Sequence, residues 1–169
     1  MSTTSQRQIG QPATDPTDVG PPGEPAVVVI GLDGSATSWD AFSWGCGEAS
    51  RLHGRAVAVY VSPCPLSAAA GAAAIPGVLV DYAAFQDAAN EQAAHLRADA
   101  LRQVAGQPLD LTFIHAWGDP AQELLRVSRA VQASVIAIGR STKLRHRIAG
   151  SLGRRLMTKP RAPVMVTVP

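Results

Sequence analysis

The stretch that decides the fold is Ala26-Val-Val-Val-Ile-Gly-Leu32, which is followed directly by Asp33-Gly-Ser35. A β-branched run that is apolar on both faces predicts a strand inside a parallel sheet, because helices cover both faces of such a sheet. The Asp-Gly-Ser sequence predicts a turn, and Ser35 is a suitable N-cap for a helix that extends to about His53. The folded part of the chain is therefore expected to begin with a strand and a helix.

Strand and helix alternate along the rest of the chain. Apolar runs predict further strands at 55–61, 109–117, 134–139 and 163–168, and capping residues or helical periodicity predict helices at 81–105, from 119 onward and at 150–159. Short alternating units force parallel pairing with right-handed crossovers. The predicted fold class is α/β, a single-domain open doubly wound parallel sheet of five strands with four helices.

Composition sets the expected organisation and location. Residues 1–25 are polar, rich in Pro, Gly, Thr and Gln, and without periodicity, so we expect a flexible tail before a single domain at 26–169. Cys46 and Cys64 have no metal-ligand or redox spacing, which suits a reducing compartment. Because the chain shows neither a secretory signal nor an unbroken apolar stretch, we expect a cytoplasmic protein without a membrane segment.

The basic residues are concentrated in one segment. Residues 140–161 contain eight of the fifteen Lys and Arg residues and none of the thirteen Asp and Glu residues. The net charge of +2 is too small for a general polyanion binder, but this segment should attract a local anion. No aromatic residue is interleaved with these bases, so nucleic acid is not an expected partner.

Candidate ligand-binding residues follow the predicted strands. Ligands of doubly wound sheets bind beyond the carboxyl ends of the strands, where the winding reverses. Asp33 directly follows the first predicted strand, Val61 and Gly139 end two others, and a helix begins at Gly150-Ser151. A helix start with a hydroxyl and nearby cations suits a phosphate, and the Asp33 carboxylate can accept a hydrogen bond from an amino group or a ribose hydroxyl. The Val61 side chain would form an apolar wall against the base of a bound ligand.

Each of these residues also has a purely structural interpretation. Asp33 can serve only as a turn or capping residue, Val61 as core, and the glycines as strand and helix ends. The chain has no phosphate-binding GxxxxGK[ST] loop and no GxSxG nucleophile motif, and its histidines have no paired ligand spacing. We therefore expect neither a catalytic activity nor a required metal.

From Val27 to Val168 the order of elements resembles the universal stress protein family. The segments that carry the resemblance are the strand before Asp33-Gly-Ser35, the helix opening Gly118-Asp-Pro120, the strand Ile136-Ala-Ile-Gly139, and the closing pair Gly150-Ser-Leu-Gly-Arg-Arg-Leu156 and Pro163-Val-Met-Val-Thr-Val168. The resemblance implies an adenine nucleotide alpha hydrolase-like fold with strand order 3-2-1-4-5. It also implies a non-catalytic stress-response or signalling protein that binds ATP, AMP or cyclic AMP.

The resemblance also assigns roles to the candidate residues. In the nucleotide-binding branch of the family, the signature G-x2-G-x9-G-[ST] holds the phosphates. An aspartate after the first strand contacts adenine there, and a valine at the end of the second strand supports it. By resemblance, Asp33 and Val61 contact the base, and Gly139, Gly150 and Ser151 hold the phosphates.

The signature is incomplete in this chain. Thr142 stands where the second glycine is expected, and only seven residues separate it from Gly150, two fewer than in the signature. A Cβ at this position and a tighter loop hinder the backbone from wrapping a triphosphate, so either the surplus of Arg and Lys compensates or a monophosphate or cyclic nucleotide fits better. The alternative is a dimeric stress protein that binds no nucleotide and acts as a protein-interaction module. The last strand, 163–168, carries little charge at an expected sheet edge, which predicts a two-fold homodimer through this strand.

Overall fold

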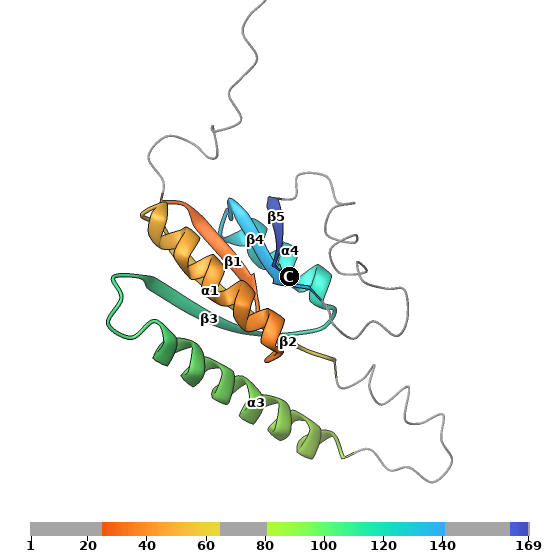
Figure 1. The fold of residues 1–169 in the computed structure, drawn as a ribbon. Helices are drawn as coiled ribbons and strands as arrows, with labels where there is room; N and C mark the ends of the chain where they lie inside the picture. Colours follow the sequence, from red (N-terminus) through yellow and green to blue (C-terminus); the bar gives the residue numbers. More distant parts are fainter. Residues whose placement is uncertain (1–24, 65–80, 141–162, 169) are drawn as a thin grey trace, which may run out of the picture.

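A computed structural model describes residues 25–64, 81–140 and 163–168 of the chain. These residues form a five-stranded parallel sheet with the strand order β3-β2-β1-β4-β5 (Figure 1). The strands are β1 (Val27–Gly31), β2 (Arg55–Ser62), β3 (Asp110–Trp117), β4 (Val135–Gly139) and β5 (Val164–Val168). The predicted fold class and strand order are both confirmed.

Three of the four predicted helices lie in the described residues. They are α1 (Ala36–Arg51), α3 (Tyr82–Gln103) and α4 (Pro120–Ala130). The predicted helix at 150–159, the expected tail at 1–25 except Pro25, and most of the basic segment 140–161 lie outside the described residues.

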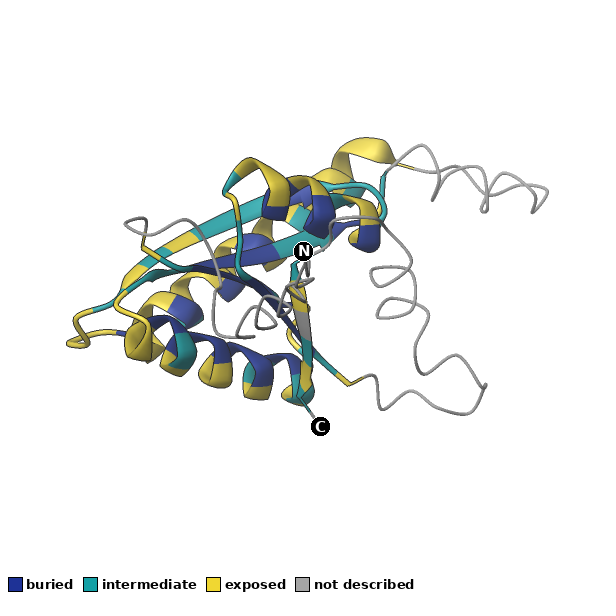
Figure 2. Ribbon diagram, turned by 90° about the horizontal axis from the view of Figure 1, so that it is seen from above, coloured by how far each residue is buried: buried dark blue, intermediate teal, exposed yellow. Residues whose placement is uncertain are grey.

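The sheet separates two layers of core. On one face, α1 and α3 pack against the side chains of alternate strand residues, with Phe42, Cys46, Leu96 and Ala100 among the buried helix residues. On the other face, α4 buries Ala121, Leu124, Leu125 and Val127 against the remaining strand residues. Figure 2 shows the buried positions on the strands and on the inward sides of the helices. Because both faces are covered, the strands are apolar on both sides, as the sequence of β1 indicates.

Side-chain caps set where the helices begin. The Ser35 hydroxyl accepts a hydrogen bond from the Ser38 N–H at 3.2 Å, which starts α1 at the predicted residue. The Asp119 carboxylate accepts one from the Gln122 N–H at 3.1 Å, and Pro120 occupies the first turn of α4, also as predicted. Each cap satisfies a backbone N–H that has no partner within its own helix. The starts of α1 and α4 are therefore fixed directly after β1 and β3.

Among the described residues, the two outer strands each have one unpaired edge. β3 pairs only with β2, and β5 pairs only with β4, among the described residues. The prediction that the last strand lies at a sheet edge is therefore confirmed. Val164 in β5 is 58% exposed, which is high for a valine in a strand.

Candidate functional site

The carboxyl ends of β1, β2 and β4 lie side by side. Gly31 pairs with Val59 of β2, and Ile30 pairs with Ala137 of β4, so the residues that follow these pairs reach the same edge of the sheet. Asp33, Val61 and Gly139 therefore meet at this carboxyl edge. The structure brings these three predicted site residues together, whereas Gly150 and Ser151 lie outside the described residues.

Asp33 shapes the turn between β1 and α1. Its Oδ1 accepts a hydrogen bond from the Ser35 N–H at 2.9 Å, and its own N–H donates to the Ser38 Oγ at 3.3 Å. Gly34 has a φ of +85°, a conformation that a residue with a side chain rarely adopts. The structural role expected for an Asp-Gly-Ser turn is therefore present.

The Asp33 carboxylate nevertheless stays accessible. Partial burial alone raises the pKa of Asp33, but hydrogen bonds from Ser35 and Ser38 together lower this pKa below its usual value. The group is thus ionised at neutral pH and can only accept hydrogen bonds. Because its side chain is exposed, it can accept a further hydrogen bond from outside the protein.

Gly139 lies against the first turn of α1. A Cβ at this position would be 2.4 Å from both the carbonyl carbon and the carbonyl oxygen of Thr37, and 2.7 Å from the Ser38 nitrogen. These are backbone atoms, so a glycine is required for the end of β4 to approach α1 this closely. Directly after it, the Arg140 N–H donates to the Val168 carbonyl at 2.8 Å, and the Arg140 side chain is exposed.

Val61 faces the α4 side of the sheet. Its side chain is half-buried and packs against the cluster that contains Val59 and Leu124. Its neighbours Tyr60 and Ser62 face the α3 side, because successive strand residues point to opposite faces. Val61 therefore contributes to the core and still offers apolar surface near the carboxyl edge.

The comparisons with known proteins identify the family. The model of the Universal stress protein family matches residues 26–168, which is nearly all of the chain. This chain belongs to the universal stress protein family. A comparison with curated proteins finds no match.

Solved structures of universal stress proteins share the fold of this family member. A protein of the family from Burkholderia pseudomallei is 23% identical, with a TM-score of 0.67, and the match covers 88% of this chain and 99% of that one. A universal stress protein in complex with cAMP is 17% identical, with a TM-score of 0.57 and coverage of 86% and 97%. A third, from Archaeoglobus fulgidus in complex with dAMP, is 16% identical, with a TM-score of 0.57 and coverage of 86% and 98%.

This universal stress protein also has a polar and aromatic cluster that the sequence analysis missed. The Oγ of Ser62, which is fully buried, lies 2.9 Å from the Nε2 of His115. The imidazole stacks on Tyr60 with ring centroids 5.4 Å apart, and its centroid lies 5.0 Å from that of Trp117. Residues 115 and 117 share a strand face by simple alternation, but their proximity to Tyr60 and Ser62 depends on the β2–β3 register.

The hydrogen bond to Ser62 holds the His115 ring in place. Burial lowers the pKa of His115, so its imidazole is neutral at pH 7. The described residues give the Ser62 Oγ no other side-chain partner, and a buried hydroxyl that donates to nothing costs about 1–3 kcal/mol. Donation from Ser62 to Nε2 satisfies this hydroxyl, and in that tautomer the ring proton lies on Nδ1.

The described residues contain neither a candidate metal site nor a helix that could span a membrane. Within residues 25–64, 81–140 and 163–168, no group of three His, Cys, Asp or Glu side chains is arranged to hold a metal ion. In the same residues, every helix is too short or too polar to cross a membrane.

Proposed function

We propose that this universal stress protein binds an adenine nucleotide at the carboxyl edge of the sheet and acts as a non-catalytic stress-response or signalling protein. The observation that carries the proposal is the exposed, ionised carboxylate of Asp33 beside the ends of β2 and β4. As an obligatory acceptor it complements the amino group of adenine or a ribose hydroxyl. Val61 would support the base, and Gly139, Gly150 and Ser151 would hold the phosphate.

Solved relatives favour a small nucleotide. Two universal stress proteins with this fold are in complex with cAMP and with dAMP, each of which carries a single phosphate. Thr142 and the short loop before Gly150 also favour a monophosphate or cyclic form over ATP. The proposal includes neither a metal nor a catalytic step, since the assigned residues only bind and orient the ligand. We place the protein in the cytoplasm, where both cysteines stay reduced.

Calorimetric titration with ATP, AMP and cyclic AMP tests the proposal. We expect AMP and cyclic AMP to bind more tightly than ATP. Asp33→Asn keeps the turn, because Asn makes the same side-chain hydrogen bond to the backbone, but removes the negative charge. This variant should weaken binding about tenfold, the usual effect of losing a hydrogen bond to a charged group.

Asp40→Asn is the matched control. Asp40 is an exposed carboxylate on α1 outside the Asp33 turn, and its neutralisation should leave the affinity unchanged. Absence of heat with all three nucleotides at millimolar concentrations would reject nucleotide binding. Equal effects of the two Asn variants would reject the role of Asp33.

The second candidate function is a dimeric interaction module. The edge position of β5 and the 58% exposure of Val164 favour pairing with a second copy of this chain. Sedimentation should show a dimer at tens of micromolar. Val164→Lys places a charge on the edge strand and should give a monomer, whereas Leu52→Lys, at an exposed leucine beside the end of α1, should not. A wild-type monomer would contradict this assignment.

A further inference from the structure

A hollow separate from the carboxyl-edge site lies between α3 and the edge strand β3. Its volume is about 240 Å³, and it is lined by Ala93, Ala94, Arg97, Phe113 and His115. None of these residues is among those proposed to hold the nucleotide.

The hollow exists because the helix contributes small side chains opposite rings. Ala93 and Ala94 precede Arg97 by four and three residues, so all three lie on one side of α3. Phe113 and His115 alternate on β3 and face this side of the helix. A methyl group cannot fill the space above an aromatic ring, and a larger residue at Ala94 would occupy it.

Arg97 brings an unbalanced positive charge to this hollow. Three other arginines in helices, Arg51, Arg102 and Arg126, each pair with a carboxylate three residues earlier. Arg97 has Ala94 at the corresponding position, and the described residues give it no ion pair. A guanidinium of this kind is suited to bind a planar carboxylate through two parallel hydrogen bonds.

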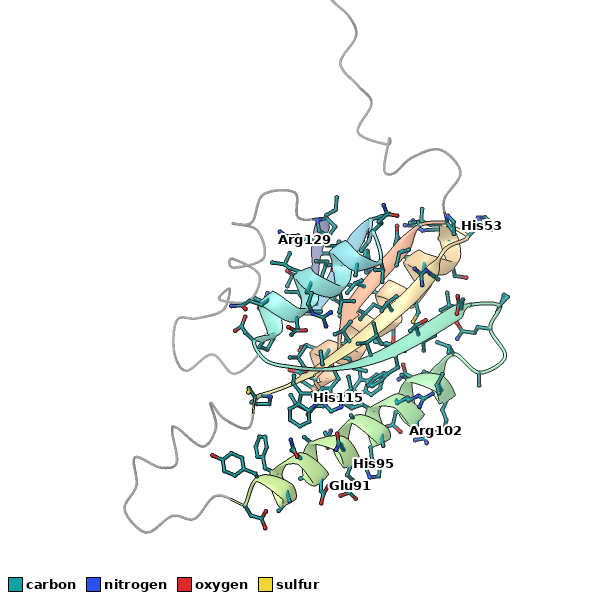
Figure 3. The ribbon with its side chains drawn as sticks, turned by 180° about the vertical axis from the view of Figure 1, so that it is seen from behind. His53, Glu91, His95, Arg102, His115 and Arg129 are labelled. Atoms are coloured by element: carbon teal, nitrogen blue, oxygen red, sulfur yellow. The ribbon has the colours of Figure 1, made fainter. Side chains whose placement is uncertain are left out.

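His115 adds an oriented donor. Ser62 and Tyr60 hold its ring, and in the tautomer in which Ser62 donates to Nε2 the ring proton lies on Nδ1. Figure 3 shows His115 in the layer between the strands and α3, whereas Glu91 and His95 lie on the far side of that helix. The carboxylate of Glu91 therefore does not compete with an incoming anion.

We propose that this hollow binds a small aromatic carboxylate. The ring of the ligand lies against Phe113, and its carboxylate accepts hydrogen bonds from Arg97 and from the Nδ1–H of His115. A hollow of about 240 Å³ has room for a single substituted aromatic ring. Two rings and one cation line the hollow, and they match a ligand that has an apolar ring and one anionic group.

NMR titration of the full-length protein with benzoate tests the proposal. Benzoate should shift the side-chain resonances of Arg97 and His115 in a saturable way. Benzyl alcohol has the same ring but no charge, and it should bind about tenfold more weakly because it loses the charge-assisted hydrogen bonds. Unchanged Arg97 and His115 resonances, or shifts that never saturate, would overturn the proposal.

Paired substitutions on α3 locate the site. Arg97→Gln should weaken benzoate binding about tenfold, whereas Arg102→Gln, on the opposite side of the helix, should have no effect. Ala94→Leu should abolish binding by filling the hollow, whereas Ala88→Leu, at an exposed position on the opposite side, should leave it intact. Equal effects within either pair would refute the location.

The result does not depend on the nucleotide proposal. AMP binding, measured in the same samples, should be unchanged by Arg97→Gln and Ala94→Leu. If AMP fails to bind while benzoate still shifts Arg97 and His115, only the carboxyl-edge assignment fails. If AMP binds and benzoate does not, only the hollow is misassigned.

Discussion

Replacement of Gly139 by alanine should destabilise the protein by moving α1 away from β4. The new Cβ would lie 2.4 Å from the Thr37 carbonyl carbon and oxygen, whereas ordinary contacts begin at 3.4 Å. The end of β4 and the first turn of α1 must therefore separate by about 1 Å. No flexible side chain can absorb this shift, because the obstructing atoms belong to the backbone.

Two opposing effects set the size of the change. Overpacking of this kind costs about 1–3 kcal/mol, and rigid backbone on both sides places Gly139→Ala near the upper value. Alanine also restricts the unfolded chain more than glycine does, which raises the free energy of unfolding by about 0.4–1 kcal/mol. The net loss in the free energy of unfolding is about 2 kcal/mol, which lowers the Tm of a domain of this size by about 4–8 °C.

Gly47→Ala provides the matched control within α1. A Cβ at Gly47 meets no atom within 4 Å, so this exposed helix position should gain about 0.5–1 kcal/mol from the better helix former. Thermal unfolding followed by circular dichroism, with urea titrations at 25 °C, measures both variants. If Gly139→Ala is as stable as the wild type, or if Gly47→Ala loses as much stability, the steric argument is wrong.

Other residues give further predictions. Phe42→Ala should cost about 3–5 kcal/mol in urea titrations, because Phe42 is only 1% exposed and packs edge-on to Trp39; a loss below 1 kcal/mol would contradict this core assignment. Burial raises the pKa of the Cys46 thiol from 9.0 to about 11. In a Cys64→Ser variant at pH 8, Cys46 of the folded protein should therefore react with a disulfide reagent about a hundredfold more slowly than Cys46 of the unfolded protein. Equal rates in the two states would show that the thiol is accessible. The fold lowers the pKa of Asp33 below 3.8. The ionised Asp33 carboxylate therefore stabilises the fold fully above pH 3.8, and this stabilisation is lost as the pH falls through the pKa of the folded state. Asp33→Asn should thus be less stable than the wild type at pH 7 in urea titrations, and the gap should close below about pH 4; a constant gap would exclude the charge as its cause.

The fold could be predicted because local rules agree along this chain. The apolar run before Asp33 and the caps Ser35 and Asp119 each specify one element without reference to distant contacts. Strand order came from the resemblance to the family, since alternation alone does not determine which parallel strands are neighbours. The structure then confirmed that order.

The site could be predicted only in part, because proximity across strands is not a local property. Asp33, Val61 and Gly139 could be grouped by the rule that ligands bind at the carboxyl ends of parallel strands. The contact of Ser62 with His115 spans 53 residues and depends on the register of β2 and β3. The alanines of α3 that lie opposite that ring could not be predicted either, because the position of α3 against β3 is not a local property.

The first turn of α1 links the two parts of the proposed nucleotide site. The Asp33 N–H donates to the Ser38 Oγ, and Gly139 lies against the Thr37 carbonyl and the Ser38 nitrogen. The spacing between Asp33 and Gly139 is therefore set by how α1 packs on β4. A loss of binding in Gly139→Ala would follow from this displacement even if Gly139 never touched a phosphate. Asp33→Asn, which leaves the turn and the packing of α1 intact, is the variant that separates ligand recognition from the framework that supports it.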